Sequence, residues 1–298
     1  MNLTLDRLPA KRQDLTFDVL SAAFVQAVGL KRFDSDTLKT LELLSDSDGY
    51  NNAAAILADR SPFPGIDMAH FGESISIIRR RETYEGSSIL DEFDAGIGFF
   101  RNVFLYEEVV GTKRRVVERV PLEAFREALA NAIVHRTWDV EARIRISMFD
   151  DRVEVSSPGG LPVGISEEEY LSDRVSIRRN PVIANVFYRL GIIEAFGTGI
   201  LRIKAAYENS LSKPAFAISE NSIMVTLPVL QVDLGLTEDQ QLVYDLLSAA
   251  RPMSSGEIAE RVDFGRTKLG RILKELVGTG FVVAVGSGRG LKYRRAEP

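Results

Sequence analysis

The sequence contains no cysteine and only two histidines, His70 and His135. Without cysteine the chain can form neither a disulfide nor a thiolate metal site. Two histidines are too few for a His-rich zinc or iron site. A chain of this composition fits a reducing compartment, and the cytoplasm is the default expectation.

Long apolar runs are also absent from the sequence. No stretch approaches the roughly 18 consecutive apolar residues of a membrane span, and Met1 is not followed by a signal-peptide pattern. We therefore expect no membrane association. The sequence has no Gly-Lys-Ser or Gly-Lys-Thr, so the phosphate cradle of P-loop proteins is missing. This absence excludes an ordinary P-loop motor, including a helicase.

An excess of positive charge is missing as well, because the formal net charge is -5 at pH 7. Any surface for nucleic acid must therefore be local. The 298 residues exceed the usual length of one domain. The expected elements predict an α+β protein in three parts. These are an N-terminal helical and β linker region at 1–110, a central α/β domain at 111–230, and a C-terminal winged helix-turn-helix domain at 236–298.

A predicted helix in the central domain carries an unusual polar face. Glu127, Asn131 and His135 are four residues apart, so they share one side of the helix. The apolar positions that cluster on the opposite side are Leu122, Phe125, Leu129 and Ile133. Two alternatives remain for the polar face, a solvated surface or the wall of a pocket. The small apolar residues beside it, such as Ala124 and Ala128, favour the pocket.

Two glycine-containing turns follow this helix. The alternating segments 143–149 and 152–156 predict a β-hairpin whose second strand runs into Pro158-Gly159-Gly160. Further on, Gly197-Thr198-Gly199 precedes a predicted helix at 200–209.

The C-terminal segment is locally basic although the chain is acidic. Three predicted helices and a glycine-tipped hairpin describe a winged helix-turn-helix. Its third helix and hairpin concentrate positive charge, as expected of elements that meet a DNA groove and its phosphates. The candidate DNA-binding residues are Arg266, Lys268, Arg271, Lys274, Arg289 and Lys292. The alternative is a winged helix used for dimerisation or protein contact.

Four segments of the central region together resemble a known family. They are Arg126-Glu-Ala-Leu-Ala-Asn-Ala-Ile-Val-His-Arg136, Asp150-Asp-Arg-Val-Glu-Val-Ser-Ser-Pro-Gly-Gly-Leu-Pro162, Arg179-Asn-Pro-Val-Ile-Ala184, and Arg189-Leu-Gly-Ile-Ile-Glu194 with Gly197-Thr-Gly-Ile200. In this order they are similar to the divergent GHKL-type ATPase domain of proteins labelled RecG-like or Schlafen/AlbA-type transcriptional regulators. The resemblance implies a GHKL-like α/β sandwich with an N-terminal helical and β extension, and relatives usually end in a winged helix.

The resemblance also implies a nucleotide site with ATP and Mg²⁺ as cofactors. Glu127 would be the catalytic, water-activating carboxylate, Asn131 the Mg²⁺ ligand, and His135 a residue lining the site. A carboxylate can take a proton, and a neutral oxygen can hold a hard cation. The remaining expected cofactor-binding residues lie in the two turns and are Gly159, Gly160, Gly197, Thr198 and Gly199.

Two features depart from the family pattern. GHKL enzymes place an aspartate before the first glycine box to accept a hydrogen bond from adenine, whereas Ser157-Pro158 stand there in this sequence. Relatives usually carry an AlbA-like domain before the linker helices, but too few residues precede the first matched segment. The chain is therefore expected to be a shortened relative or a fragment.

These observations lead to three functional hypotheses. The first is a cytoplasmic transcriptional regulator that binds double-stranded DNA and senses a nucleotide, as a homo-oligomer because operators pair their half-sites. The second is an active Mg-ATPase that couples hydrolysis to conformational change on DNA. The third is a degenerate GHKL fold used only for dimerisation. Whether the chain is an enzyme stays open at this point.

Overall fold

The computed structural model describes residues 4–110, 113–162, 164–172, 178–194, 198–231, 235–248 and 251–296, without the side chains of 108–110, 113–115 and 289. The chain divides into two compact units, unit 1 at Met1–Gln231 and unit 2 at Val232–Pro298. The fold is α+β, as the sequence predicts. No helix in the described ranges is long and apolar enough to cross a membrane.

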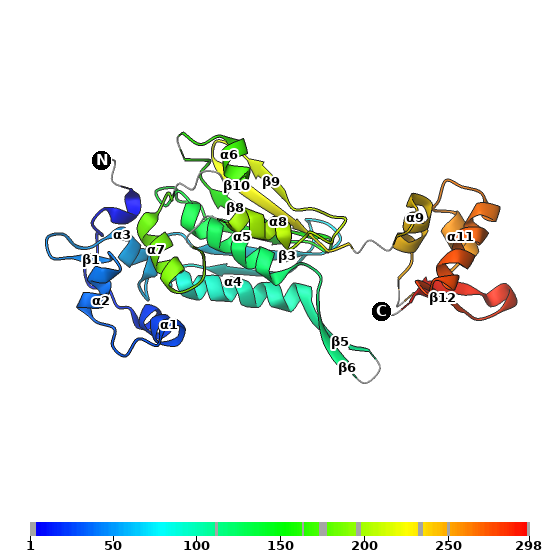
Figure 1. Cartoon of the computed structure of the whole chain (residues 1–298), viewed down its shortest axis with the longest axis horizontal. Coiled ribbons are helices and arrows are strands. Elements are labelled where there is room, and N and C mark those ends of the chain that lie inside the picture. The colour runs from blue at the N-terminus through cyan, green and yellow to red at the C-terminus, as the bar shows by residue number, and fades with distance from the viewer. Residues whose placement is uncertain are drawn as a thin grey trace. The chain divides into compact units, whose positions relative to one another are not determined.

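Unit 1 alternates helices with strands along the chain (Figure 1). In order its elements are η1 (Leu5–Arg7), α1 (Asp18–Val28), α2 (Ser35–Thr40), β1 (Leu44–Ser45), β2 (Gly49–Tyr50), α3 (Asn52–Leu57), β3 (Ile66–Phe71), β4 (Ile78–Tyr84), α4 (Ile89–Phe104), β5 (Leu105–Val110), β6 (Lys113–Glu118), α5 (Leu122–His135), β7 (Ile144–Met148), β8 (Arg152–Pro158), α6 (Glu167–Leu171), α7 (Pro181–Arg189), α8 (Gly199–Ala205), β9 (Ala215–Ile218) and β10 (Ser222–Pro228).

A mixed six-stranded sheet forms one layer of unit 1, in the order β4-β3-β7-β8-β10-β9. Only β3 and β7 pair in parallel, and the other neighbours are antiparallel. Strands from both sides of the predicted boundary at residue 110 share this sheet. Burial alternates along β8 and β10, as expected when one sheet face is covered and the other is not.

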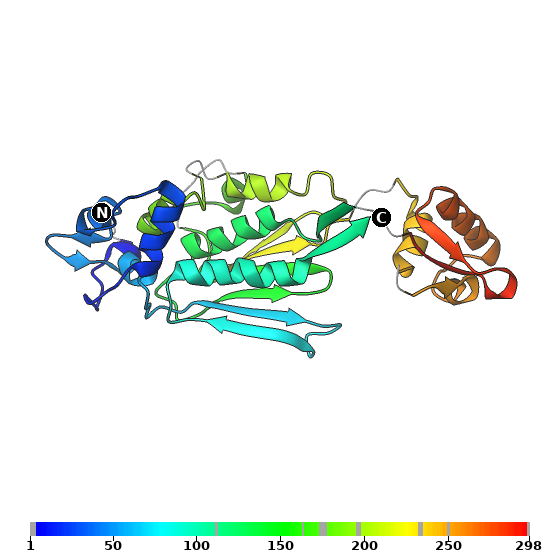
Figure 2. The same ribbon diagram turned by 90° about the horizontal axis from the view of Figure 1, so that it is seen from below.

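Helices α4, α5 and α8 lie along the covered face and form the second layer (Figure 2). One apolar core joins the layers and includes the stacked rings of Phe100 and Phe125, whose centroids are 4.1 Å apart. The N-terminal helices contribute Leu20 and Phe24 to the same core. This two-layer arrangement is an α/β sandwich, in agreement with the sequence-based expectation.

Arg79, Arg80 and Arg81 lie on β4, which is an edge strand. Its arginines are exposed, and two of them form ion pairs with Asp150 and Asp67. This edge of the sheet is therefore charged and exposed to solvent.

Unit 2 contains three helices followed by a small sheet. Its elements are α9 (Glu238–Leu246), β11 (Met253–Ser254), α10 (Ser255–Ala259), α11 (Arg266–Gly278), β12 (Val282–Val285), η2 (Gly288–Gly290) and β13 (Lys292–Arg295). The sheet order is β11-β13-β12, and a separate core includes Val243, Ile258 and Leu273. Capping boxes begin α9 at Thr237 and α10 at Ser254. The unit is a winged helix.

Candidate functional site

Helix α5 is buried on almost every side. Its first free N–H, that of Leu122, donates to the Glu118 carboxylate at 3.2 Å. The apolar positions Phe125, Leu129 and Ile133 are fully buried, and Glu127 on the polar face is only 3% exposed. The solvated interpretation of the polar face is therefore wrong at Glu127, because other parts of the chain cover it.

The cover over this face is the start of α8. A Cβ atom placed on Gly199 would lie 2.5 Å from Oε1 of Glu127 and 2.6 Å from Nδ2 of Asn131. Only glycine permits so close an approach of the α8 backbone to these side chains. Thr198 is next to this contact, while Gly197 lies outside the described residues. The structure thus brings Glu127 and Asn131 together with Thr198 and Gly199, from distant parts of the sequence.

Thr198 places a buried hydroxyl beside this contact. Its Oγ1 atom is buried and has no hydrogen-bond partner among the described residues. A buried hydroxyl without a partner costs about 1–3 kcal/mol of stability. Such groups are rare in folded proteins, and a bound ligand is one way in which they are satisfied.

His135 lies at the other end of the polar face and is half-buried. Desolvation, together with the positive charges of Arg179 and Arg178, lowers the pKa of His135 to about 4. At neutral pH the ring is therefore uncharged, and it offers an anion a hydrogen bond but no positive charge.

A small cavity lies between α5 and the sheet, with a volume of about 20 Å³. That volume suffices for about one water molecule. A nucleotide would need a pocket of several hundred Å³. The residues that line the cavity are Ala128, Asn131, Ala132, His135, Val155, Ser157, Tyr170, Ile223 and Val225.

The Pro158-Gly159-Gly160 turn is packed against the chain itself. Gly159 has a φ of +101°, and a Cβ there would meet Thr137 and Arg179. A Cβ on Gly160 would meet the backbone of the β9–β10 turn. In this conformation the space beside both glycines is occupied by atoms of the protein itself.

Ser157 also uses its side chain within the chain. It is buried, and its hydroxyl donates to the carbonyl of Ala132 on α5 at 2.8 Å. The residue at the position of the family's adenine-binding aspartate thus ties β8 to α5.

Two further residues hold the end of α5, and sequence reasoning gave them no such role. Arg179 donates to the carbonyls of Gly160 at 2.6 Å and His135 at 3.2 Å. Asn180 donates to the carbonyls of Val134 at 2.8 Å and Arg136 at 2.9 Å. The available signal was the cluster Arg178-Arg179-Asn180 directly before the proline that begins α7.

A buried arginine follows the same helix end. The guanidinium of Arg136 is fully buried and donates to the carbonyls of Pro64, Val140 and Ala142, at 2.8, 3.2 and 2.6 Å. It lies 4.2 Å from the centroid of Trp138. Burial lowers the pKa of Arg136 to about 10, and burial raises the pKa of nearby Glu92 to about 8.

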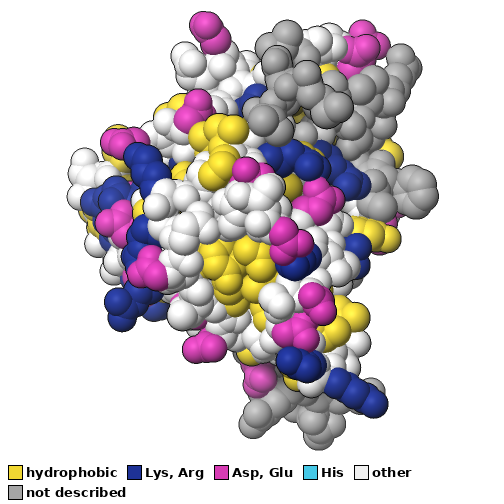
Figure 3. All heavy atoms as spheres, turned by 90° about the vertical axis from the view of Figure 1, so that its left-hand side faces the viewer, with side chains coloured by type: hydrophobic (Ala, Val, Ile, Leu, Met, Phe, Trp, Pro, Cys, Tyr) yellow, Lys and Arg dark blue, Asp and Glu magenta, His cyan; other side chains and the backbone are white. Residues whose placement is uncertain are grey.

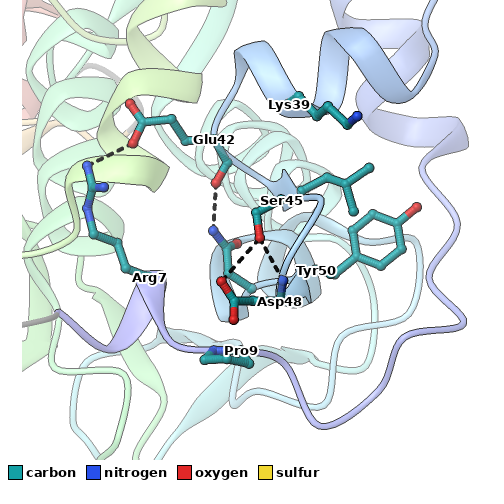
Figure 4. Close-up of a pocket in the computed structure, with 10 residues that line it drawn as sticks. Arg7, Pro9, Lys39, Glu42, Ser45, Asp48 and Tyr50 are labelled. Carbon is teal, nitrogen blue, oxygen red and sulfur yellow. Dashed lines mark hydrogen bonds and ion pairs between the residues drawn. The ribbon is translucent and has the colours of Figure 1, made fainter.

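A larger cavity of about 570 Å³ lies among the N-terminal elements (Figure 4). Its charges are largely neutralised within the chain, since Arg7 pairs with Glu42 at 2.8 Å and Lys39 pairs with Asp46 at 2.5 Å. The Asn51 side chain donates to the carbonyl of Glu42 at 2.6 Å. Figure 3 shows this end of unit 1, where an apolar patch is bordered by side chains of both charges.

Helix α11 separates an apolar side from a polar one. Leu269, Ile272, Leu273 and Leu276 are buried in the core of unit 2. The exposed positions are Arg266, Thr267, Gly270, Arg271 and Lys274. Arg271 is loosely held, with a contact of 4.0 Å to Glu275 and a side chain that is 70% exposed. The predicted exposed face of the third helix is therefore present as expected.

The other predicted DNA-binding residues differ in their surroundings. Lys268 is drawn toward α9 by an ion pair with Asp239 at 2.5 Å and lies over the Phe264 ring. Lys292 is exposed on the wing, while the Arg289 side chain lies outside the described part of the structure. Lys268 is thus held by its own unit, whereas Arg266, Arg271, Lys274 and Lys292 are directed to the surface.

Each unit contains a segment that matches a known protein family. Residues 141–227 match the family described as "Putative ATP-dependent DNA helicase recG C-terminal". Residues 230–298 match the family described as "Sugar-specific transcriptional regulator TrmB". The resemblance to a divergent GHKL-type domain followed by a winged helix is confirmed. Each match describes only its own segment of the chain.

A solved structure shares the fold of the whole chain. It is the DIP2311 protein from Corynebacterium diphtheriae, with 21% sequence identity and a TM-score of 0.67. The match covers 99% of this chain and 64% of that protein, so the chain spans less than two thirds of its length. No curated protein matches the sequence.

Proposed function

We propose that the protein is a cytoplasmic transcriptional regulator that binds double-stranded DNA through unit 2. The observation that carries the proposal is the exposed basic face of α11, formed by Arg266, Arg271 and Lys274. The similarity of this segment to a transcriptional-regulator family supports it. In winged helices of this kind the third helix enters the major groove and the wing meets the phosphates. Lys292 on the wing extends the same charge.

The test is the salt dependence of affinity for a DNA duplex of mixed sequence. Each lost phosphate contact reduces the slope of log K against log salt concentration by about 1. Arg271→Ala/Lys274→Ala is therefore expected to bind more weakly and to lower the slope by about 2. Lys268→Ala is the matched control, because Lys268 already pairs with Asp239. An affinity and slope unchanged in the double variant would contradict the proposal.

The α5–α8 contact favours a second activity, the binding of a nucleotide with Mg²⁺. A carboxylate, a carboxamide and a buried, unsatisfied hydroxyl meet there, from Glu127, Asn131 and Thr198. The Asn131 amide oxygen would hold the cation, and the Thr198 hydroxyl would donate to a phosphate. No three His, Asp or Glu residues converge on a metal site in the described ranges, so the phosphates would supply further ligands.

The chemistry of these residues fits a nucleotide, but the enclosed space does not. The 20 Å³ cavity must enlarge before a nucleotide enters. Asn131 borders both this cavity and the start of α8, so a nucleotide that is also to reach Thr198 would require the start of α8 to move away from Asn131. A ligand that binds only the open form shifts the chain toward it. Nucleotide sensing would be this shift in population. The Mg-ATPase alternative additionally requires Glu127 to accept a proton from water.

Calorimetry with Mg-ATP distinguishes these cases. We expect heat of binding with the intact chain, loss of that heat in Asn131→Ala, and no change in Asn102→Ala, which alters an exposed residue of α4. Absence of heat with the intact chain would favour the remaining hypothesis, a degenerate GHKL fold used only for dimerisation. Binding without release of phosphate would remove the ATPase alternative.

A further inference from the structure

A cavity of about 270 Å³ lies in unit 2 between α10, α11 and β13. Its apolar lining consists of Leu269 and Leu273, which are buried in the core of the unit. Polar side chains line the rest of it, from Ser255 on α10, Arg266 on α11 and Tyr293 on β13. The cavity therefore borders the helix whose exposed face carries the proposed DNA contacts.

The polar side chains of this cavity can all donate hydrogen bonds. The hydroxyls of Ser255 and Tyr293 and the guanidinium of Arg266 make no hydrogen bond or ion pair with any residue that the structure describes. No described lining residue is acidic. The carboxylate nearest to Ser255 in the sequence is that of Glu257, and it accepts from the N–H and the hydroxyl of Ser254 at 2.7 and 2.8 Å. Unused donors without a competing carboxylate are suited to an anion.

Gly270 leaves this cavity open on the side of α11. It is exposed in the interior of the helix, and a Cβ there would meet no described atom within 4 Å. No described part of the chain therefore requires glycine at this position, although glycine destabilises a helix interior relative to alanine. A glycine kept at a cost to the helix, beside unused donors, is expected where another molecule closely approaches the backbone.

The position of the cavity indicates which part of DNA would reach it. When a helix lies in the major groove, its outward face meets the base edges and its flanks run along the sugar–phosphate strands that border the groove. The cavity lies on one flank of α11, between this helix and β13 of the wing. Lys292, which pairs with Ser254 in the sheet, adds positive charge on the wing side. A phosphate, rather than a base, is therefore the group that fits.

We propose that the cavity between α10, α11 and β13 binds one phosphate of the DNA backbone. Arg266 supplies positive charge and hydrogen bonds, Ser255 and Tyr293 donate through their hydroxyls, and Gly270 gives the DNA strand room to approach. The inference rests on the proposed binding of DNA by unit 2. It adds a contact that fixes the position of α11 along the duplex without reading the sequence.

Removal of the two hydroxyls tests this phosphate site without a change of charge. Ser255→Ala/Tyr293→Phe in the full-length chain is expected to weaken binding to a DNA duplex at least about fivefold and to keep the wild-type salt dependence. The loss should be the same on two duplexes of unrelated sequence, because a phosphate contact carries no sequence information. Tyr188→Phe, which alters an exposed tyrosine of α7, is the matched control and should bind like the wild type. A loss confined to one duplex would assign the hydroxyls to bases and would overturn the phosphate site.

Gly270→Met tests the space in the cavity. Methionine is uncharged and favours a helix, so the fold should be retained while its side chain obstructs the DNA strand. Loss of the charge-assisted contact to Arg266 is expected to weaken DNA binding at least about tenfold. Gly98→Met is the matched control, because Gly98 is an exposed glycine of α4 at which a Cβ would also meet no described atom. Denaturant unfolding of both variants verifies that they fold.

The outcomes separate this inference from the proposed function. Wild-type affinity in Gly270→Met or in Ser255→Ala/Tyr293→Phe would overturn the phosphate site. If Arg271→Ala/Lys274→Ala still weakened binding in that case, DNA binding through the exposed face of α11 would stand. A wild-type chain that binds no duplex would overturn both.

Discussion

Glu92→Gln should make the protein less sensitive to rising pH. Glu92 is 2% exposed, and burial raises its pKa from the ordinary 4.5 to about 8. The folded chain therefore prefers the protonated form, so the stability associated with Glu92 is complete below pH 4.5 and is lost as the pH rises through 8. At about 1.36 kcal/mol per pH unit, the interval from 4.5 to about 8 sets an upper limit of about 5 kcal/mol on the stability that Glu92 costs the chain between acid and alkaline pH. Glutamine is neutral throughout and avoids this loss.

The measurement is the free energy of unfolding from denaturant titrations at several pH values between about 5 and 9. Wild type and Glu92→Gln should be similar near the acid end, and the variant should gain up to several kcal/mol at the alkaline end. All other titrating groups are shared, so they cancel in the difference. Glu123→Gln, which alters an exposed glutamate of α5, should follow the wild type. Parallel curves for Glu92→Gln and wild type would show that Glu92 ionises freely and would refute the reasoning.

Two other substitutions address the same end of α5. Arg136→Ala should destabilise the chain by about 3–5 kcal/mol, because it leaves three carbonyls without their donor and empties the space of a fully buried side chain. Thermal and denaturant unfolding would measure this loss. Gly159→Ala should lower the free energy of unfolding by about 1–3 kcal/mol, since the φ of +101° at Gly159 and its contact with Thr137 both oppose a Cβ. An unchanged denaturation midpoint would contradict that geometry.

Local sequence patterns predict those elements that are stabilised by residues close to one another in the sequence. The predicted strand at 152–156 corresponds to β8, and a capping box at Ser166 begins α6. The periodicity of segment 52–58 does not distinguish a helix from a buried strand. The structure has a helix there, because the Asn51 side chain accepts from the Ala54 N–H and caps it. That cap was a usable signal in the sequence.

Long-range contacts could not be predicted from local patterns. The spacing of Glu127 and Asn131 predicts a shared face but not what covers it, and the cover comes from Gly199, far along the chain. The parallel pairing of β3 with β7 likewise follows from packing of the intervening α4 and α5 against the sheet. Arg136 is the clearest failure, because a charged residue at a helix end suggests solvent. Its burial is explained only by the distant carbonyl of Pro64, the carbonyls of Val140 and Ala142 in the segment that follows, and the ring of Trp138.

Thr198→Val separates a site built for a ligand from a contact built only for stability. Valine has nearly the shape of threonine but no hydroxyl, and the Thr198 Oγ1 atom is buried without a partner among the described residues. Removing it should therefore raise the free energy of unfolding by about 1–2 kcal/mol. If Thr198 donates to a nucleotide phosphate, the same substitution should weaken Mg-ATP binding, while Thr198→Ser, which keeps the hydroxyl, should retain it. Denaturant unfolding and calorimetry on the same samples measure both quantities. A more stable variant that has lost affinity is expected where a polar group is kept for function at the expense of stability. A less stable variant would mean that the hydroxyl is satisfied in the folded chain, and would contradict its assignment to a ligand.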